Sequence, residues 1–93
     1  MKYFIRYGNK NSTIDITEQI IENIVNDRYY HIPKLNDNER ADLYGDPCFG
    51  TVKSIIITSD EGHLFYIDPS EYAYIDIKDE ILYLNELPTD IVQ

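Results

Sequence analysis

Hydrophobic positions follow two different periods along the chain, and this separates one helical stretch from several extended ones. Between positions 16 and 25, isoleucine and valine recur at i, i+4, i+5, i+8 and i+9, with polar residues between them. This spacing predicts an amphipathic helix of about ten residues, with Asp15 at its N-cap and its end near Asn26 and Asp27. Because so short a helix is marginal alone, its apolar side needs a sheet to cover.

The other hydrophobic runs are short, rich in β-branched and aromatic residues, and bounded by Gly, Pro, Asn or Asp. Such runs predict strands, and the short turns between them predict antiparallel pairing. Residues 59–62 form one such turn, a hairpin loop between two runs. Strands are expected at residues 2–7, 28–32, 51–58, 63–67, 71–77 and 80–84.

The run from 71 to 77 alternates most cleanly, which predicts a strand with one covered and one open face. We expect Ala73, Ile75 and Ile77 to face the core because they are the apolar set. The open face would then carry Tyr72, Tyr74 and Asp76.

The polar segment from 36 to 45 predicts a second, short helical turn. Asn36 or Asp37 would cap its start, and Gly45 would take the left-handed position after its end. The expected fold is α+β: an antiparallel β-meander of about four to five strands, with one amphipathic helix packed on it and the short helical turn beside it. At this length, residues 1–93 are expected to form a single small domain.

Charge is unevenly distributed along the chain. Residues 1–58 carry eight acidic and seven basic side chains, whereas residues 59–93 carry nine acidic side chains and Lys78 as the single base. The two stretches therefore have net charges of −1 and −8 within a total of −9. This asymmetry predicts a negative potential over the C-terminal part of the surface, and it concerns partners rather than the fold.

Carboxylates and tyrosines on one sheet face suit a partner rich in Arg and Lys, because acids pair with cations and rings supply buried area and cation–π contacts. We therefore expect a non-enzymatic interaction module that binds a basic protein surface, as an inhibitor or nucleic-acid mimic does. The plainer interpretation is a solvated surface that resists aggregation. The negative charge argues against direct contact with nucleic acid. The expected partner-binding residues are Asp60, Glu61, Asp68, Glu71, Tyr72, Tyr74, Asp76, Asp79 and Glu80.

The segment from 37 to 50 lacks a clear period and is punctuated by Gly and Pro, so it offers a second candidate site. If Arg40 and Lys53 converge beside it, they would hold an anionic ligand. A structural ion pair with Asp37 or Asp46 is the simpler interpretation. The residues of this possible ligand loop are Asp37, Arg40, Tyr44, Asp46, Cys48 and Lys53.

Catalytic and metal signatures are absent from the sequence. Cys48 with His31 or His63 would supply a nucleophile and a base, but no local motif supports the pair. The histidine spacing does not fit zinc, and Gly45 comes too late for a calcium loop. We therefore expect no cofactor and no bound metal. An enzyme or small-ligand binder centred on residues 37–50 is the weakest functional alternative.

Composition also bears on location and on a rival function. The single cysteine rules out an internal disulfide, and no run approaches the roughly 20 apolar residues of a membrane span. Residues 1–5 lack the features of a signal peptide, so a cytoplasmic protein is expected. The bias toward Asn, Ile, Lys, Asp and Tyr suggests a low-GC bacterium, its phage or a large virus, with the host cytoplasm as the location in the viral cases. The rival function is a structural or accessory module that self-assembles.

Overall fold

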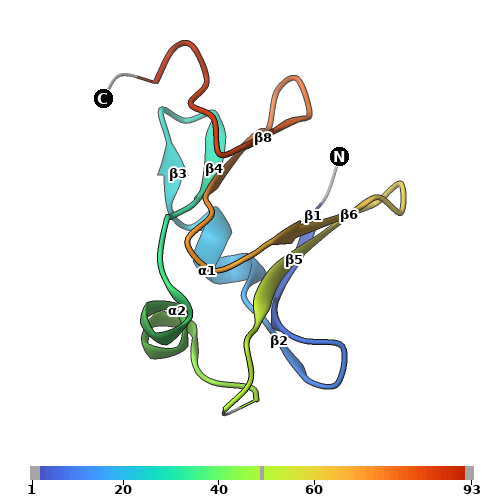
Figure 1. The fold of residues 1–93 in the computed structure, drawn as a ribbon. Helices are drawn as coiled ribbons and strands as arrows, with labels where there is room; N and C mark the ends of the chain where they lie inside the picture. Colours follow the sequence, from blue (N-terminus) through green and yellow to red (C-terminus); the bar gives the residue numbers. More distant parts are fainter. Residues whose placement is uncertain (1–2, 49, 92–93) are drawn as a thin grey trace.

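The computed structural model describes residues 3–48 and 50–91, and this part of the chain forms eight strands and two short helices (Figure 1). The helices are α1 (Thr17–Ile21) and α2 (Asp37–Tyr44). The strands are β1 (Tyr3–Gly8), β2 (Thr13–Asp15), β3 (Ile24–Val25), β4 (Tyr29–Ile32), β5 (Ser54–Ser59), β6 (Leu64–Ile67), β7 (Ala73–Asp76) and β8 (Ile81–Leu84).

The described strands pair in two antiparallel sheets of four strands each. The first sheet has the order β2-β1-β5-β6 and the second has the order β3-β4-β7-β8. The predicted α+β class with antiparallel strands is confirmed, although the strands are more numerous than expected and lie in two sheets. Each sheet joins a hairpin from the N-terminal half of the chain to one from the C-terminal half, so neither half completes a sheet alone.

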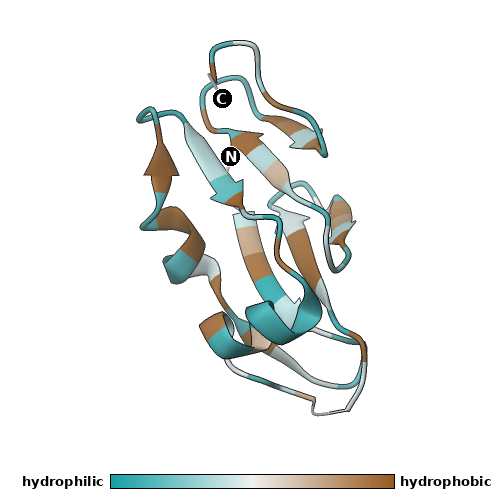
Figure 2. Ribbon diagram, turned by 60° about the vertical axis from the view of Figure 1, so that its left-hand side comes forward, coloured by the Kyte–Doolittle hydropathy of each residue, from teal (hydrophilic) through white to brown (hydrophobic). Residues whose placement is uncertain are grey.

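The core lies where the two sheets and α1 meet. In β1 and β5, alternate side chains point inward and are fully buried, as a period of two requires. Figure 2 shows the strands and α1 as the more hydrophobic parts of the ribbon, while α2 is largely hydrophilic. The buried cluster consists of Ile5, Tyr7, Ile16, Ile20, Ile32, Ile55, Ile57, Ile67, Ala73 and Ile75.

The predicted ten-residue helix is wrong in its second half and in its N-cap, which is Ile16 and not Asp15. Helix α1 ends at Ile21, and the last two apolar positions of the pattern form β3 instead. The cause is the turn that follows, in which Asn26 and Asp27 both have a φ of 53° and the Val25 carbonyl accepts from the Arg28 N–H. Asn and Asp tolerate this left-handed conformation better than most residues, so they favour a tight hairpin between β3 and β4.

The second helix matches its prediction. The Asn36 side chain accepts a hydrogen bond from the Glu39 N–H, and the Glu39 carboxylate accepts one from the Asn36 N–H. This reciprocal capping box fixes the start of α2. Gly45 follows the helix with a φ of 102°, a conformation that glycine adopts without a steric penalty.

Strand β7 is covered on both sides, which corrects the expected open face. Ala73 and Ile75 are fully buried as predicted, but Tyr74 is only 8% exposed and Asp76 only 1%. Tyr74 is covered because β4 lies beside β7 and its His31 ring stacks on the Tyr74 ring, with centroids 4.3 Å apart. The alternation of β7 therefore distinguishes two buried environments, one apolar and one polar.

Candidate functional site

The nine predicted partner-binding residues do not form one acidic face, and three of them belong to the connection between β6 and β7. There Glu71 accepts hydrogen bonds from the Asp68 N–H and from Asn85 Nδ2. Asp68 in turn accepts one from the Ser54 hydroxyl, and the Tyr72 N–H donates to Asn85. Local bonds of this kind stabilise the connection.

Two further members of the predicted surface, Asp76 and Asp79, are paired with Arg28. The Arg28 Nη2 atom lies 2.8 Å from Asp76 Oδ2 and 2.9 Å from Asp79 Oδ2. Asp76 also accepts hydrogen bonds from the backbone N–H groups of Lys78 and Asp79. The hydrogen bonds from Arg28 hold the pKa of the Asp76 carboxyl below its usual value despite burial. Asp76 is a buried anchor, and the expectation that it lies on an open face is wrong.

The remaining predicted acids gather at the end of the molecule where hairpins from the two sheets meet. Asp60 and Glu61 lie in the loop between β5 and β6, and Glu80 lies in the turn between β7 and β8. Burial, and then the negative charges of Glu80, Asp60, Asp76 and Glu61, raise the pKa of the Tyr3 hydroxyl. Acids from both hairpins therefore act on the hydroxyl of one tyrosine. We call Tyr3, Asp60, Glu61 and Glu80 the acidic end.

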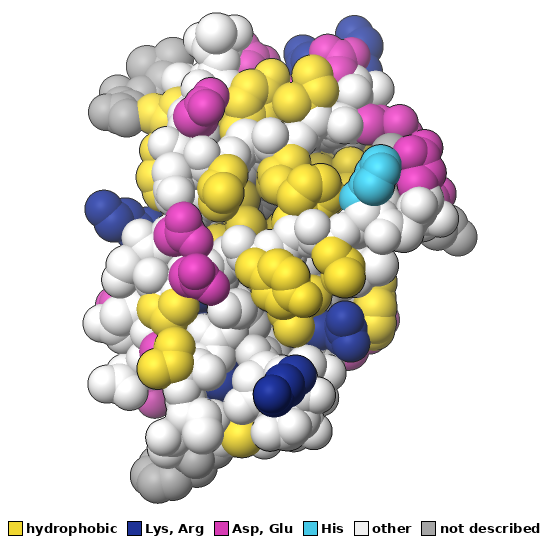
Figure 3. Space-filling view, turned by 45° about the vertical axis from the view of Figure 1, so that its right-hand side comes forward, with side chains coloured by type: hydrophobic (Ala, Val, Ile, Leu, Met, Phe, Trp, Pro, Cys, Tyr) yellow, Lys and Arg dark blue, Asp and Glu magenta, His cyan; other side chains and the backbone are white. Residues whose placement is uncertain are grey.

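A small hollow opens at the acidic end. Its volume is about 60 Å³, which is far below that of a small-molecule site but is enough for the end of one side chain. Figure 3 shows hydrophobic side chains over the centre of this side of the molecule and acidic side chains along its right-hand rim. The hollow is lined by Tyr3, Ile57, Ser59, His63, Phe65, Glu80 and Leu82.

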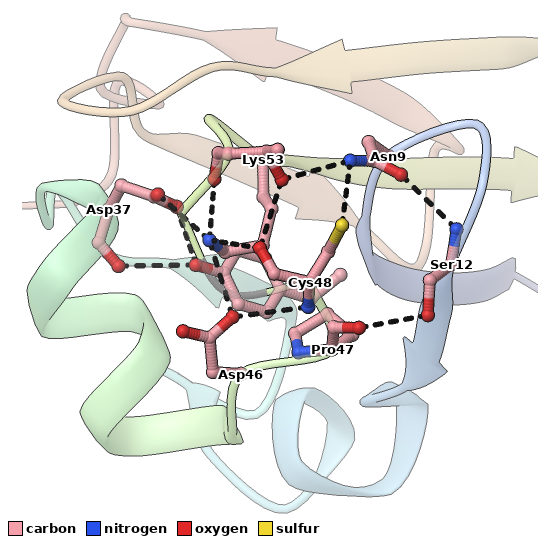
Figure 4. Close-up of polar contacts among 9 residues, drawn as sticks. Asn9, Ser12, Asp37, Asp46, Pro47, Cys48 and Lys53 are labelled. Carbon is pink, nitrogen blue, oxygen red and sulfur yellow. Dashed lines mark hydrogen bonds and ion pairs between the residues drawn. The ribbon is translucent and has the colours of Figure 1, made fainter.

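The predicted ligand loop converges on Lys53, whose side chain is only 3% exposed (Figure 4). The Lys53 Nζ atom lies 3.1 Å from Asp37 Oδ2 and 3.4 Å from Asp46 Oδ1. It also donates to the backbone carbonyls of Thr51 and Cys48, at 2.7 and 3.3 Å. We call these five residues the Lys53 cluster. An ammonium has three N–H bonds, so these four acceptors leave no donor for an anionic ligand.

Arg40 takes no part in the Lys53 cluster. Its side chain is fully buried and donates to the backbone carbonyls of Ile67 and Glu71, each at 2.9 Å. The guanidinium therefore ties α2 to the connection between β6 and β7, and its burial lowers its pKa. Arg40 and Lys53 do not converge on a common ligand site. The ion-pair interpretation holds for Lys53, whereas the hydrogen bonds of the Arg40 side chain to described residues go to carbonyl groups.

Tyr7 joins the Lys53 cluster to the core, a role that the sequence pattern did not reveal. The Tyr7 hydroxyl donates to Asp37 Oδ1 at 2.5 Å, and its ring packs against that of Tyr44 with centroids 5.8 Å apart. Burial and the bond to Asp37 raise the pKa of the Tyr7 hydroxyl above its ordinary value. The signal that would have shown this role is a tyrosine at an inward position of β1, where a buried hydroxyl needs a partner.

Cys48, whose backbone carbonyl belongs to the Lys53 cluster, is half-buried. Its Sγ atom accepts a hydrogen bond from Asn9 Nδ2 at 3.3 Å. Bonds from Thr51 and Asn9, together with the charge of Lys53, lower the pKa of the thiol. This environment increases the thiolate fraction and therefore the reactivity of the sulfur.

The histidines lie elsewhere, so the nucleophile–base pair considered from sequence does not form in the described residues. His31 stacks on Tyr74 of the second sheet, and His63 lines the hollow at the acidic end. No group of three or more His, Cys, Asp or Glu side chains in residues 3–48 and 50–91 is placed to hold a metal ion. Neither helix in this part of the chain is long and apolar enough to span a membrane.

A larger hollow, which the sequence did not indicate, lies between α1, β4 and α2. Its volume is about 450 Å³, within the range of small-molecule sites. We call it the α1–α2 groove. The sequence placed His31 on a strand, but no local pattern indicated that Tyr44 would lie across from it. The groove is lined by Gln19, Ile20, Glu22, Asn23, His31, Pro33, Leu43 and Tyr44.

We compared the chain with protein-family models, with curated proteins and with solved structures. None of the three comparisons gave a significant match.

Proposed function

We propose that this protein is a non-enzymatic interaction module whose acidic end binds a basic segment of a protein partner. The proposal rests on one observation: Tyr3 and Glu80 line one hollow, and acids from two hairpins in different sheets lie near enough to Tyr3 to raise the pKa of its hydroxyl. Asp60 and Glu61 come from one hairpin and Glu80 from the other. A binding role of this kind fits an inhibitor that occupies the basic surface of a nucleic-acid-handling protein.

The chemistry of the acidic end suits a lysine or arginine side chain. The Tyr3, Phe65 and Leu82 side chains supply aromatic and aliphatic contact for the stem, and Glu80 lines the same hollow. Asp60 and Glu61 lie in the neighbouring β5–β6 loop. Charge-assisted hydrogen bonds and cation–π contacts both favour a cation in this position. The charge of −8 on residues 59–93 would also attract a basic partner from a distance.

The test compares two charge-matched double variants. The first, Asp60→Asn with Glu61→Gln, neutralises the β5–β6 tip, and the second, Asp42→Asn with Glu86→Gln, removes the same charge at other exposed positions. Partners are captured from host lysate on each protein, and the affinity of the purified partner is then measured at 50 and 300 mM salt. We expect the tip variant to bind about tenfold more weakly and the control to lose less than about twofold.

Two results would contradict the proposal. Equal weakening of both double variants would mean that net charge alone attracts the partner. Binding that is unaffected by salt would mean that ion pairs do not hold the complex. Either result would remove the acidic end as the binding site.

Self-association is a second candidate function, favoured by the outer face of the first sheet. Phe4, Leu64 and Tyr66 are 45%, 52% and 56% exposed there, next to Ile56. Exposed apolar clusters of this kind mark protein interfaces. Sedimentation velocity at high salt tests this candidate: a concentration-dependent dimer that Phe4→Ser with Tyr66→Ser abolishes supports it, and a monomer at all concentrations excludes it.

A further inference from the structure

The α1–α2 groove is distinct from the acidic end and has the build of a ligand site. Three elements form its walls, and α1 and α2 lie on the same side of the molecule (Figure 1). Ile20, Pro33 and Leu43 supply apolar contact surface along it. At about 450 Å³ it accommodates a small organic group, whereas the hollow at the acidic end accommodates only a side-chain tip.

Two polar side chains of the groove have no hydrogen-bond partner among the described residues. The His31 ring is held in one orientation by stacking on Tyr74, and burial lowers the pKa of its imidazole. A neutral imidazole offers one acceptor nitrogen and one N–H donor. The Tyr44 ring is likewise held by packing on Tyr7, and its hydroxyl makes no hydrogen bond within this part of the chain. Both groups are positioned in advance of any ligand, which reduces the entropy cost of binding.

The charged residues that line the groove determine whether it favours a cationic or an anionic ligand. Among the described residues that line it, Glu22 is the one acidic side chain, and neither Lys nor Arg is present. An anionic group would therefore meet a carboxylate without a compensating cation. A cationic group would pair with Glu22 and approach the electron-rich face or hydroxyl of Tyr44.

We propose that the α1–α2 groove binds an alkyl guanidinium or alkyl ammonium group. The alkyl part lies against Ile20, Pro33 and Leu43, and the cationic end lies near Glu22 with Tyr44 beside it. This chemistry occurs both in free small amines and in the Arg or Lys side chains of a protein. The inference does not depend on the acidic end, because the two sites share no lining residue.

The test is an NMR titration of the isotope-labelled protein with n-butylguanidinium, with n-butylurea as a neutral analogue of the same shape. We expect shifts confined to residues of the groove and a Kd on the order of millimolar, as usual for a fragment of this size. The matched variants are Glu22→Gln and Glu18→Gln, because both residues are exposed acids of the α1 region and only Glu22 lines the groove. Glu22→Gln should weaken binding at least about fivefold, and Glu18→Gln should leave it within about twofold.

Three results would overturn the proposal: equal binding of n-butylurea, equal effects of the two variants, or shifts located at the acidic end. A blocked tripeptide, acetyl-Gly-Arg-Gly-amide, then identifies the source of the cation. If the peptide binds at least as tightly as n-butylguanidinium, the groove takes a protein side chain. If only the small cation binds, the groove takes a free amine or guanidine. If the Asp60→Asn, Glu61→Gln variant did not weaken partner binding, the proposed function would fail, but the titration of the α1–α2 groove would be unaffected.

Discussion

The Lys53 cluster and the α1–α2 groove both use residues of α2, and they differ in how their polar groups are satisfied. Asp37, at the start of the helix, pairs with Lys53 and accepts from the Tyr7 hydroxyl. Tyr44, at the end of the helix, presents a hydroxyl without a partner among the described residues. Helix α2 therefore contributes one residue whose polar atoms are paired within the protein and another whose hydroxyl has no partner among the described residues.

This difference distinguishes polar groups that stabilise the fold from polar groups that remain available to bind a ligand. Buried polar groups normally find partners inside the protein, and once they have done so they stabilise the fold but offer little to a ligand. The Lys53 ammonium has four acceptors around three N–H bonds, so it has no capacity left. In the groove, His31 and Tyr44 border a hollow, and neither side chain has a hydrogen-bond partner among the described residues.

The largest expected effect comes from Arg40, in the middle of α2, because it ties the helix that both regions share to the connection between β6 and β7. Arg40→Ala leaves the Ile67 and Glu71 carbonyls without a donor and creates a cavity. We expect a loss of about 3–5 kcal/mol in the free energy of unfolding. The melting temperature should fall by about 15 °C or more. Thermal and urea denaturation followed by circular dichroism measure this loss, with the exposed Asn38→Ala of the same helix as control. A loss below about 1 kcal/mol would contradict the anchoring role.

A smaller effect, confined to one region, is expected from Lys53→Met. The substitution keeps an unbranched apolar stem but removes the terminal ammonium, which leaves Asp37 and Asp46 without their cation. Because both acids are partly exposed, we expect a loss of only about 1–3 kcal/mol in the free energy of unfolding. Binding of n-butylguanidinium in the groove should be unchanged. A loss of groove binding without unfolding would show that the two regions are coupled through α2.

The pH dependence of the Lys53→Met effect has a defined sign. Burial opposes the charged form of Lys53, but hydrogen bonds to Asp37 and Asp46 outweigh it and raise the pKa of the ammonium above 10.5. A raised pKa stabilises the folded state below the unfolded value and loses this effect as the pH rises through the folded value. The stability gap between wild type and variant should therefore persist from pH 7 to 10 and narrow only above pH 10.5. A gap that closes between pH 7 and 9 would contradict this.

The smallest expected effect concerns the reactivity of Cys48 and leaves stability nearly unchanged. Because Thr51, Asn9 and Lys53 lower the pKa of the thiol, its alkylation by iodoacetamide should reach half of its maximal rate below pH 9.0. Asn9→Ala removes one of the hydrogen bonds and should move this midpoint upward. The rate is measured by mass spectrometry across a pH series. A wild-type midpoint at or above pH 9.0 would show that the cluster does not act on the sulfur.

Local signals predicted the parts of the fold that depend on neighbouring residues. The reciprocal bonds of Asn36 and Glu39 follow from a spacing of three, and Gly45 ends α2 because few other residues adopt its φ. The helix expected over residues 16–25 failed because two local signals disagreed there. The turn chemistry of Asn26 and Asp27 outweighed the helical spacing, since β4 was available to pair with β3.

The candidate sites depended on contacts that the sequence does not encode locally. The binding surface predicted along β7 was divided because Arg28, 48 positions before Asp76, lies beside it in the sheet. The sequence offered Asp37 and Asp46 as ion-pair partners for a base of this segment, but it did not decide between Arg40 and Lys53, and the structure gives both acids to Lys53. The α1–α2 groove was not, because His31 and Tyr44 belong to different elements and only their packing places them together.

By itself, the sequence determined six of the eight strands of the described residues, the start and end of α2, and the concentration of negative charge in residues 59–93. Each depends on backbone preference, on the alternation of apolar and polar residues or on a count of charges. These are properties of short stretches of sequence. Tertiary structure alone decided that Tyr74 and Asp76 are covered, that Arg40 turns inward and that acids from two hairpins meet at Tyr3. The physical reason is that the environment of a side chain is set by whichever distant strand pairs beside it.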